Sequence, residues 1–171
     1  MISKEDIKHL EKIFPFWLDM KQNDRAKIIL SSRILSLKKN SIFFNSHELD
    51  GLLFLKSGKL RFFLSSLDAR ELPLYYLNNM EVEFFENFND KTISTILDIA
   101  FIVEKNSEIL LIPYSVLNLF RDKYSIMEKF LHNLTREKLS KSLLSLQNIL
   151  LIPLKDRLLN FLYSLNKTEI S

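Results

Sequence analysis

Glycine is scarce in this sequence, where Gly51 and Gly58 are the only two among 171 residues. Glycine reaches positive φ without strain, so a chain that uses it only twice needs it for two special backbone positions. Apolar runs at 52–55 and 60–64 lie on either side of the segment Lys56-Ser57-Gly58. Two strand-like runs separated by a short turn containing glycine predict a β-hairpin. We therefore expect structural turns at both glycines and a hairpin over residues 51–63.

Cysteine is absent altogether. This excludes disulfides, thiol redox chemistry and zinc or iron–sulfur sites held by cysteine. Long apolar runs are missing too: no segment approaches the roughly 18 residues of a membrane span, and no basic-then-apolar signal pattern opens the chain. We therefore expect a cytoplasmic protein with no membrane partner.

The residues that are present favour a packed domain. Apolar residues make up 47% of the chain, with 14 Phe, and charged residues make up 26%. This composition supports a core rich in aromatic rings and argues against disorder. The net charge of +3 and the pI near 9.0 are compatible with a nucleic-acid partner but do not demonstrate one.

Helical signals open the chain and strand signals follow. Ser3 and Asp6 have the spacing of a capping box before a first helix that Pro15 ends, and Asn23 or Asp24 can cap a second helix reaching about Ser32. Short apolar runs separated by turn-forming segments then predict eight strands, as in a sandwich, barrel or jelly roll. These runs are residues 34–37, 42–44, 52–55, 60–64, 71–77, 93–97, 99–103 and 108–112.

The longest helical signal runs over residues 126–152, after a short helix at 114–120. About 27 residues make about 40 Å of helix, too long for one small β domain to cover. We expect its apolar stripe to pair with the same helix of a second copy, although the helix could instead fold back over its own sheet. The expected seam contains His132, Thr135, Leu139, Ser142, Leu146 and Ile149, flanked by Leu131, Leu143 and Leu150.

The sequence gives no positive indication of an enzyme. His9, His47 and His132 are far apart and lack metal-ligand spacing, so we expect no metal site. There is no nucleophile elbow, no glycine-rich phosphate loop and no paired-carboxylate signature. The single histidine of the seam, His132, is only a weak candidate for a haem ligand, and we expect no cofactor.

The order of these elements resembles the sensor half of the Crp–Fnr family of bacterial transcription regulators. Lys39, Ile42 and Phe43, followed by residues 51–61 with both glycines and Arg61, resemble a signature of that family. Residues 69–77 resemble its next strand, and residues 111–113 resemble its exit from the roll. The resemblance covers nearly the whole chain. It implies an α+β fold with an eight-stranded antiparallel β-roll of the cyclic-nucleotide-binding type, a homodimer, and allosteric control of DNA binding.

The departures from the family pattern concern the phosphate-binding cassette. The chain has no arginine between Arg70 and Arg121, whereas a cyclic phosphate needs a cationic fork and free backbone N–H groups. Glu83 and Asp98 would also repel the anion. We therefore expect no ordinary response to cyclic AMP. An apolar effector pocket facing the long helix is the alternative, with core rings that leave no pocket as its simpler competitor. The candidate effector-binding residues are Tyr76, Phe84, Phe85, Ile96, Leu97, Phe101 and Thr135.

We expect three regions: a β-roll with N-terminal helices at 1–122, a dimerisation helix at 123–152, and the start of a truncated helix-turn-helix domain at 153–171. The resemblance then implies the effector-sensing and dimerisation region of a Crp–Fnr-like regulator, which binds DNA only through a domain missing from this chain. The alternatives are a haem-based gas sensor using His132, or a dimerisation module with a filled core.

Overall fold

The computed structural model describes residues 2–44, 49–65, 70–85 and 98–153, together with 155, 156, 158 and 159. The helices are α1 (Lys4–Ile13), a 3-10 turn η1 (Trp17–Asp19), α2 (Gln22–Ser31), α3 (Tyr114–Arg121) and α4 (Ser125–Leu151). The strands are β1 (Arg33–Leu37), β2 (Ile42–Phe44), β3 (Gly51–Ser65), β4 (Glu71–Asn78), β5 (Val82–Phe85) and β6 (Asp98–Pro113). The expected α+β class with an antiparallel sheet is confirmed, with six described strands where the sequence predicted eight.

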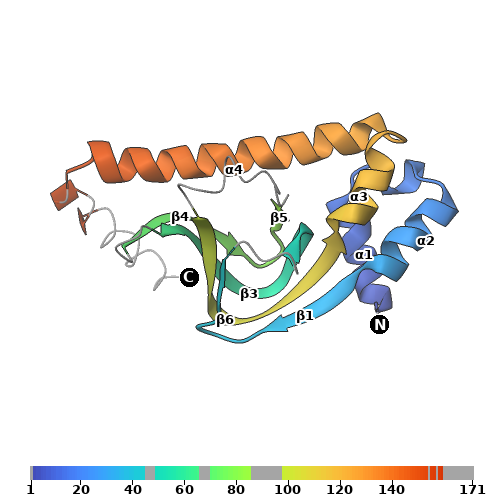
Figure 1. The fold of residues 1–171 in the computed structure, drawn as a ribbon, viewed down its shortest axis with the longest axis horizontal. Coiled ribbons are helices and arrows are strands. Elements are labelled where there is room, and N and C mark those ends of the chain that lie inside the picture. Colours follow the sequence, from blue (N-terminus) through green and yellow to red (C-terminus); the bar gives the residue numbers. More distant parts are fainter. Residues whose placement is uncertain are drawn as a thin grey trace.

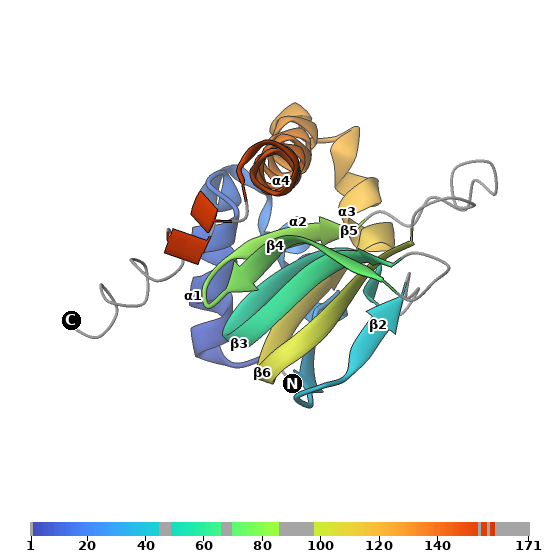
Figure 2. The same cartoon turned by 90° about the vertical axis from the view of Figure 1, so that its left-hand side faces the viewer.

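The two long strands β3 and β6 organise the sheet. They pair antiparallel along their whole length, from Gly51 opposite Pro113 to Ser65 opposite Asp98. On the side away from β3, β6 pairs with β1 and β2. On the side away from β6, β3 pairs with β5 and β4. Both long strands curve, so the sheet wraps into a roll, with α4 along one side and the shorter helices at one end (Figures 1 and 2).

The predicted hairpin over residues 51–63 is wrong. Residues 52–55 and 60–64 are two parts of the single strand β3, and residues 99–103 and 108–112 are likewise joined within β6. The register between β3 and β6 shifts three times between Leu55 and Leu60, so the turn-like segment is an irregular bend within a strand. Gly58 lies at this bend with φ +112°. The expected strand at 93–97 lies outside the described residues.

The glycines are needed because the strands approach closely. A Cβ on Gly58 would lie 2.0 Å from Ser107 Oγ and 2.7 Å from Ser107 Cα. A Cβ on Gly51, where φ is +141°, would lie 2.1 Å from the carbonyl oxygen of Ile112. Neither space admits a side chain, and both φ values belong to glycine.

Two hydrophobic cores lie on opposite faces of the paired strands. Successive strand residues point to opposite faces, so Leu52 and Phe54 enter the first core while Leu53 and Leu55 enter the second. The first core packs against α1, α2, α3 and the start of α4, and the second fills the interior of the roll. Burial on both faces explains why these strand segments are continuously apolar and do not alternate.

The start of α1 has the predicted capping box. The Asp6 N–H donates to Ser3 Oγ at 3.1 Å, and the Ser3 N–H donates to Asp6 Oδ2 at 2.8 Å. The buried Asp6 carboxylate also pairs with Lys56 of β3, at 2.7 Å between Nζ and Oδ1. The capping box therefore also attaches α1 to the roll.

The predicted cap of α2 is wrong. Its N-cap is Lys21, with no side-chain capping bond. The Asp24 carboxylate instead binds the Lys123 ammonium and accepts a hydrogen bond from the Tyr124 hydroxyl at 2.7 Å. Because Lys123 and Tyr124 immediately precede α4, this contact ties α2 to the start of the long helix.

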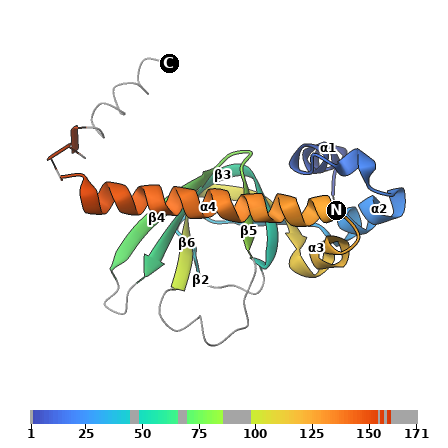
Figure 3. The same ribbon diagram turned by 90° about the horizontal axis from the view of Figure 1, so that it is seen from above.

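Seen from above, α4 crosses β4 and β5 and begins beside α1, α2 and α3 (Figure 3). One face of the helix thus lies over its own sheet, and pairing with a second copy would use another face. Most of the expected helix-turn-helix start at 153–171 lies outside the described residues. No helix in the described part of the chain is both long and apolar enough to cross a membrane.

Candidate functional site

The interior of the roll beneath α4 contains a cluster of aromatic rings. Phe62 of β3 stacks on Tyr75 of β4, with ring centroids 4.7 Å apart. Its ring also lies 5.3 Å from Phe101 of β6 and 5.5 Å from Phe85 of β5. Phe43 of β2 stacks on Phe101 at 4.9 Å. The sheet therefore brings rings from five strands to one apolar centre, which we call the ring cluster.

A buried ion pair closes this cluster on the side of α4. Glu83 of β5 is 6% exposed, and its Oε1 lies 3.2 Å from Lys138 Nζ of α4. The same oxygen accepts a hydrogen bond from the Phe84 N–H at 3.1 Å. Lys138 Nζ also lies 4.6 Å from the centre of the Phe85 ring, within the range of a cation–π contact. Burying a carboxylate is costly unless it is paired, so Glu83 depends on Lys138.

Tyr75 adds a polar group to the same place. Its side chain is 8% exposed, and its hydroxyl makes no hydrogen bond of ordinary geometry to any described residue. Burial, and then the negative charge of the nearby Glu83 carboxylate, raises the pKa of Tyr75 far above its ordinary value. The hydroxyl therefore stays protonated and provides a buried polar group at the edge of the ring cluster.

Two further polar contacts join α4 to the roll beyond Lys138. Ser145 Oγ donates to the carbonyl oxygen of Pro73 at 2.9 Å, and Lys141 Nζ lies 3.7 Å from Glu81 Oε1. Pro73 belongs to β4, which is an edge strand of the described sheet and has β3 on one side only. The carbonyl groups on the outer side of an edge strand have no strand partner, and Ser145 binds one of them.

The structure brings together only some of the predicted effector-binding residues. Phe85 and Phe101 share the ring cluster, with centroids 6.2 Å apart. Phe84 points into the other core, 6.2 Å from the Tyr114 ring. Tyr76 is 42% exposed and lies beneath Lys59, whose Nζ is 4.1 Å from the ring centre. Ile96 and Leu97 lie outside the described residues.

The predicted seam is divided between two surroundings. Leu131 is 2% exposed and packs in the first core of its own chain. Thr135 is exposed, and its hydroxyl donates to the carbonyl oxygen of Leu131 at 3.1 Å. His132 is exposed on α4. The remaining seam residues form an exposed to half-buried stripe: Leu139, Ser142, Leu143, Leu146, Ile149 and Leu150.

Sequence reasoning missed the role of Lys138 and the pairing of Glu83. Leu131, Lys138 and Ser145 are spaced by seven residues, which places them on one face of a helix. This spacing would have put Lys138 on the same face as the buried Leu131. The pairing itself required the curvature of the roll, because it brings β5 beneath α4.

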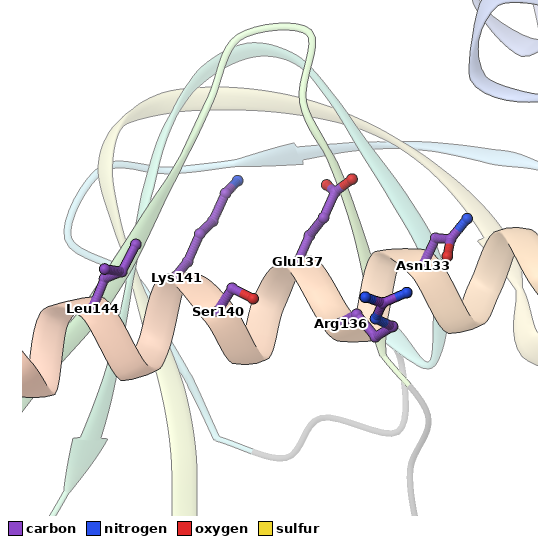
Figure 4. Close-up of a pocket in the computed structure, with 6 residues that line it drawn as sticks. All are labelled: Asn133, Arg136, Glu137, Ser140, Lys141 and Leu144. Atoms are coloured by element: carbon purple, nitrogen blue, oxygen red, sulfur yellow. The ribbon is translucent and has the colours of Figure 1, made fainter.

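A shallow hollow on α4 is a weaker candidate for a binding site. Its lining residues are Asn133, Arg136, Glu137, Ser140, Lys141 and Leu144 (Figure 4). All six belong to one helix, and one helix cannot enclose a ligand by itself. In the described part of the chain, no group of three or more His, Asp or Glu side chains has the arrangement of a metal site.

Solved structures share this fold. A protein described as a transcriptional regulator of the Crp/Fnr family from Eubacterium rectale aligns over 93% of this chain and 74% of its own, with a TM-score of 0.78 and 23% identity. FixK2 from Bradyrhizobium japonicum aligns over 80% of this chain and 67% of its own, with a TM-score of 0.63 and 14% identity. The regulator CLP from Xanthomonas campestris aligns over 84% and 71%, with a TM-score of 0.58 and 16% identity.

No protein-family model matches the chain, and no curated protein matches its sequence. One of these neighbours is described as a Crp/Fnr regulator, so the resemblance predicted from the sequence is confirmed in the fold. The chain shares the fold of these transcription regulators.

Proposed function

We propose that the chain is the effector-sensing and dimerisation region of a Crp–Fnr-like transcription regulator. The observation that carries this proposal is the Glu83–Lys138 pair, which joins the interior of the roll to the long helix. An effector bound inside the roll would change the contacts of this pair and would thereby move α4. The shift of α4 between two positions would then move the second copy and the DNA-binding domains.

The effector that best suits the ring cluster is a small hydrophobic or aromatic molecule. The cluster offers apolar faces, with one tyrosine hydroxyl and the edge of an ion pair as polar groups. Glu83 itself would not repel a cyclic phosphate, because Lys138 neutralises its charge. We still propose no ordinary response to cyclic AMP, because Lys138 is paired with Glu83 and would have to leave it to bind a phosphate. The neighbour CLP is described as responsive to c-di-GMP, which is a property of that protein.

Thermal-shift measurements test the choice of effector. We expect no change in Tm with cyclic AMP or cyclic GMP at micromolar concentrations, and a rise of several degrees with at least one member of a panel of small aromatic compounds. A Phe85→Leu variant should lose the rise because it removes a ring from the cluster. A Tyr76→Leu variant, altered on the outer surface, should keep it. A clear rise with cyclic AMP in the native chain would contradict the proposed effector class.

A further inference from the structure

The two halves of α4 are attached to the molecule in different ways. Residues 125–134 supply Met127 and Leu131 to the first core, where Phe130 and Leu134 pack beside them. The Asp24 contact to Lys123 and Tyr124 fixes the same end. The second core, inside the roll, receives no side chain from α4 among the described residues. The first half is therefore held by apolar burial, which acts over a broad contact area.

In the second half, residues 135–151, the side chains with a described contact to the roll are polar. The described contacts are the Glu83–Lys138 pair, the contact of Lys138 with the Phe85 ring, the Glu81–Lys141 pair and the Ser145 hydrogen bond. Lys141 and Glu81 are 44% and 38% exposed, and an exposed ion pair contributes little to stability. Lys138 is 21% exposed and Glu83 only 6%, so this pair is the one shielded from water. Removing one partner of a buried pair is strongly destabilising because it leaves the other charge uncompensated.

From this division we propose that the second half of α4 docks and undocks from the roll as a separate element, and that the Glu83–Lys138 pair is the contact that holds it docked. This inference extends the proposed sensor function, since it names the contact through which the roll controls the helix. Lys138 lies over Phe85 and beside the ring cluster, so a molecule entering the cluster meets this contact directly. Such a motion would bend α4 between Leu134, its last residue packed on the first core, and Lys138.

The absence of cysteine makes spin labelling a direct test. Introduced cysteines at Lys38 and Gln147 would report the second half of α4 against the roll, and a pair at Lys38 and Lys129 would report the first half. All three native side chains are exposed, so labels there should not disturb the cores. Electron–electron resonance distances should be measured with labelled chain diluted in excess unlabelled chain, so that only distances within one chain contribute.

In the otherwise native chain we expect narrow distance distributions for both label pairs. Lys138→Met should at least double the width of the 38–147 distribution and leave the 38–129 distribution unchanged. Glu83→Gln keeps a hydrogen bond to Lys138 and should broaden the 38–147 distribution less. Lys141→Met, one turn away in the exposed pair, is the matched control and should behave like the native chain.

Two results would overturn the inference. One is a 38–147 distribution that is no broader in Lys138→Met than in Lys141→Met. The other is equal broadening of both label pairs, which would mean that α4 leaves the roll as one unit. Circular dichroism checks the folding of each variant. If Lys138→Met does not fold, the 38–147 distribution of Glu83→Gln is compared with that of Lys141→Met instead. The experiment uses neither effector nor DNA, so its failure would leave the proposed regulatory function standing, and the thermal-shift result does not affect it.

Discussion

Gly58 shows how one residue sets the path of the longest strand pair. Replacing it with alanine would force a Cβ against Ser107 and demand a φ of +112° from a residue that avoids it. We expect Gly58→Ala to lower the free energy of unfolding by about 2–4 kcal/mol. Urea denaturation measures this loss. The neighbouring Ser57→Ala is the control and should change stability by less than about 0.5 kcal/mol, because Ser57 is exposed.

Asp6 should make stability depend on pH. Burial alone would oppose ionisation of its carboxyl, but hydrogen bonds from Lys56 and Ser3 outweigh burial and hold the pKa of Asp6 below its ordinary value. A lowered pKa in the folded state stabilises the protein above the ordinary value of about 4, and this contribution is lost as the pH falls from about 4 through the folded pKa. We expect Asp6→Asn to cost about 1–2 kcal/mol at pH 7.

The measurement is a series of urea denaturations from pH 7 to pH 3. The difference between the native chain and Asp6→Asn should shrink as the pH falls, because the native chain then loses the same charge. Glu5→Gln serves as the control, since Glu5 is exposed in the same first turn of α1. A difference that stays constant down to pH 3 would show that the Asp6 charge does not stabilise the fold.

At the scale of elements, the sequence predicted those whose signals are local. The capping box at Ser3, the helix after Pro113 and the long helix all depend on near neighbours in the chain, and all are confirmed. The prediction of a hairpin was wrong because a bend within a strand has the same residue types as a turn between two strands. Only the pairing of β3 with β6 along its whole length distinguishes the bent strand from a hairpin. The prediction that Asp24 caps α2 was wrong because its carboxylate binds Lys123, which lies 99 residues away in the chain.

The candidate site was predictable only in part, for the same reason. Phe85 and Phe101 could be placed together because the family resemblance supplied the roll. Sequence reasoning predicted no strand at Val82–Phe85, so it missed that Phe84 and Phe85 point to opposite sides of β5, one into each core. Nor could it show that Lys138 meets Glu83, which depends on how far α4 travels across β5.

The unequal attachment of α4 gives a prediction for that element. Leu131 is 2% exposed and lies in the first core, whereas Leu144 is 59% exposed on the same helix. We expect Leu131→Ala to lower the free energy of unfolding by about 2–5 kcal/mol, because it leaves a cavity in a packed core. Leu144→Ala should change it by less than about 0.5 kcal/mol. Urea denaturation measures the free energy of unfolding of both variants. Equal losses of this free energy would contradict the anchoring of α4 through its first half.

At the scale of the whole molecule, the exposed leucines of α4 test the proposed dimer. Leu139, Leu143 and Leu150 are 58%, 55% and 77% exposed, and they follow one stripe of the helix beside its docked face. Covering such a stripe with the same stripe of a second copy removes apolar surface from water, and the gain is lost when charges enter it. We therefore expect the native chain to form dimers and the double variant Leu139→Lys, Leu146→Lys to be monomeric.

The helix also supplies a matched control for this experiment. Leu144 and Leu151 are separated by the same seven residues but lie five positions further along, about 140° around the helix. Both are exposed, at 59% and 73%, so Leu144→Lys, Leu151→Lys adds the same charge to a different face. Light scattering over a range of concentrations should show a dimer for the control and a monomer for the seam variant. Because the two variants add equal charge, loss of the dimer in both would implicate general repulsion rather than the stripe. A native chain that stays monomeric at high concentration would refute the dimer itself.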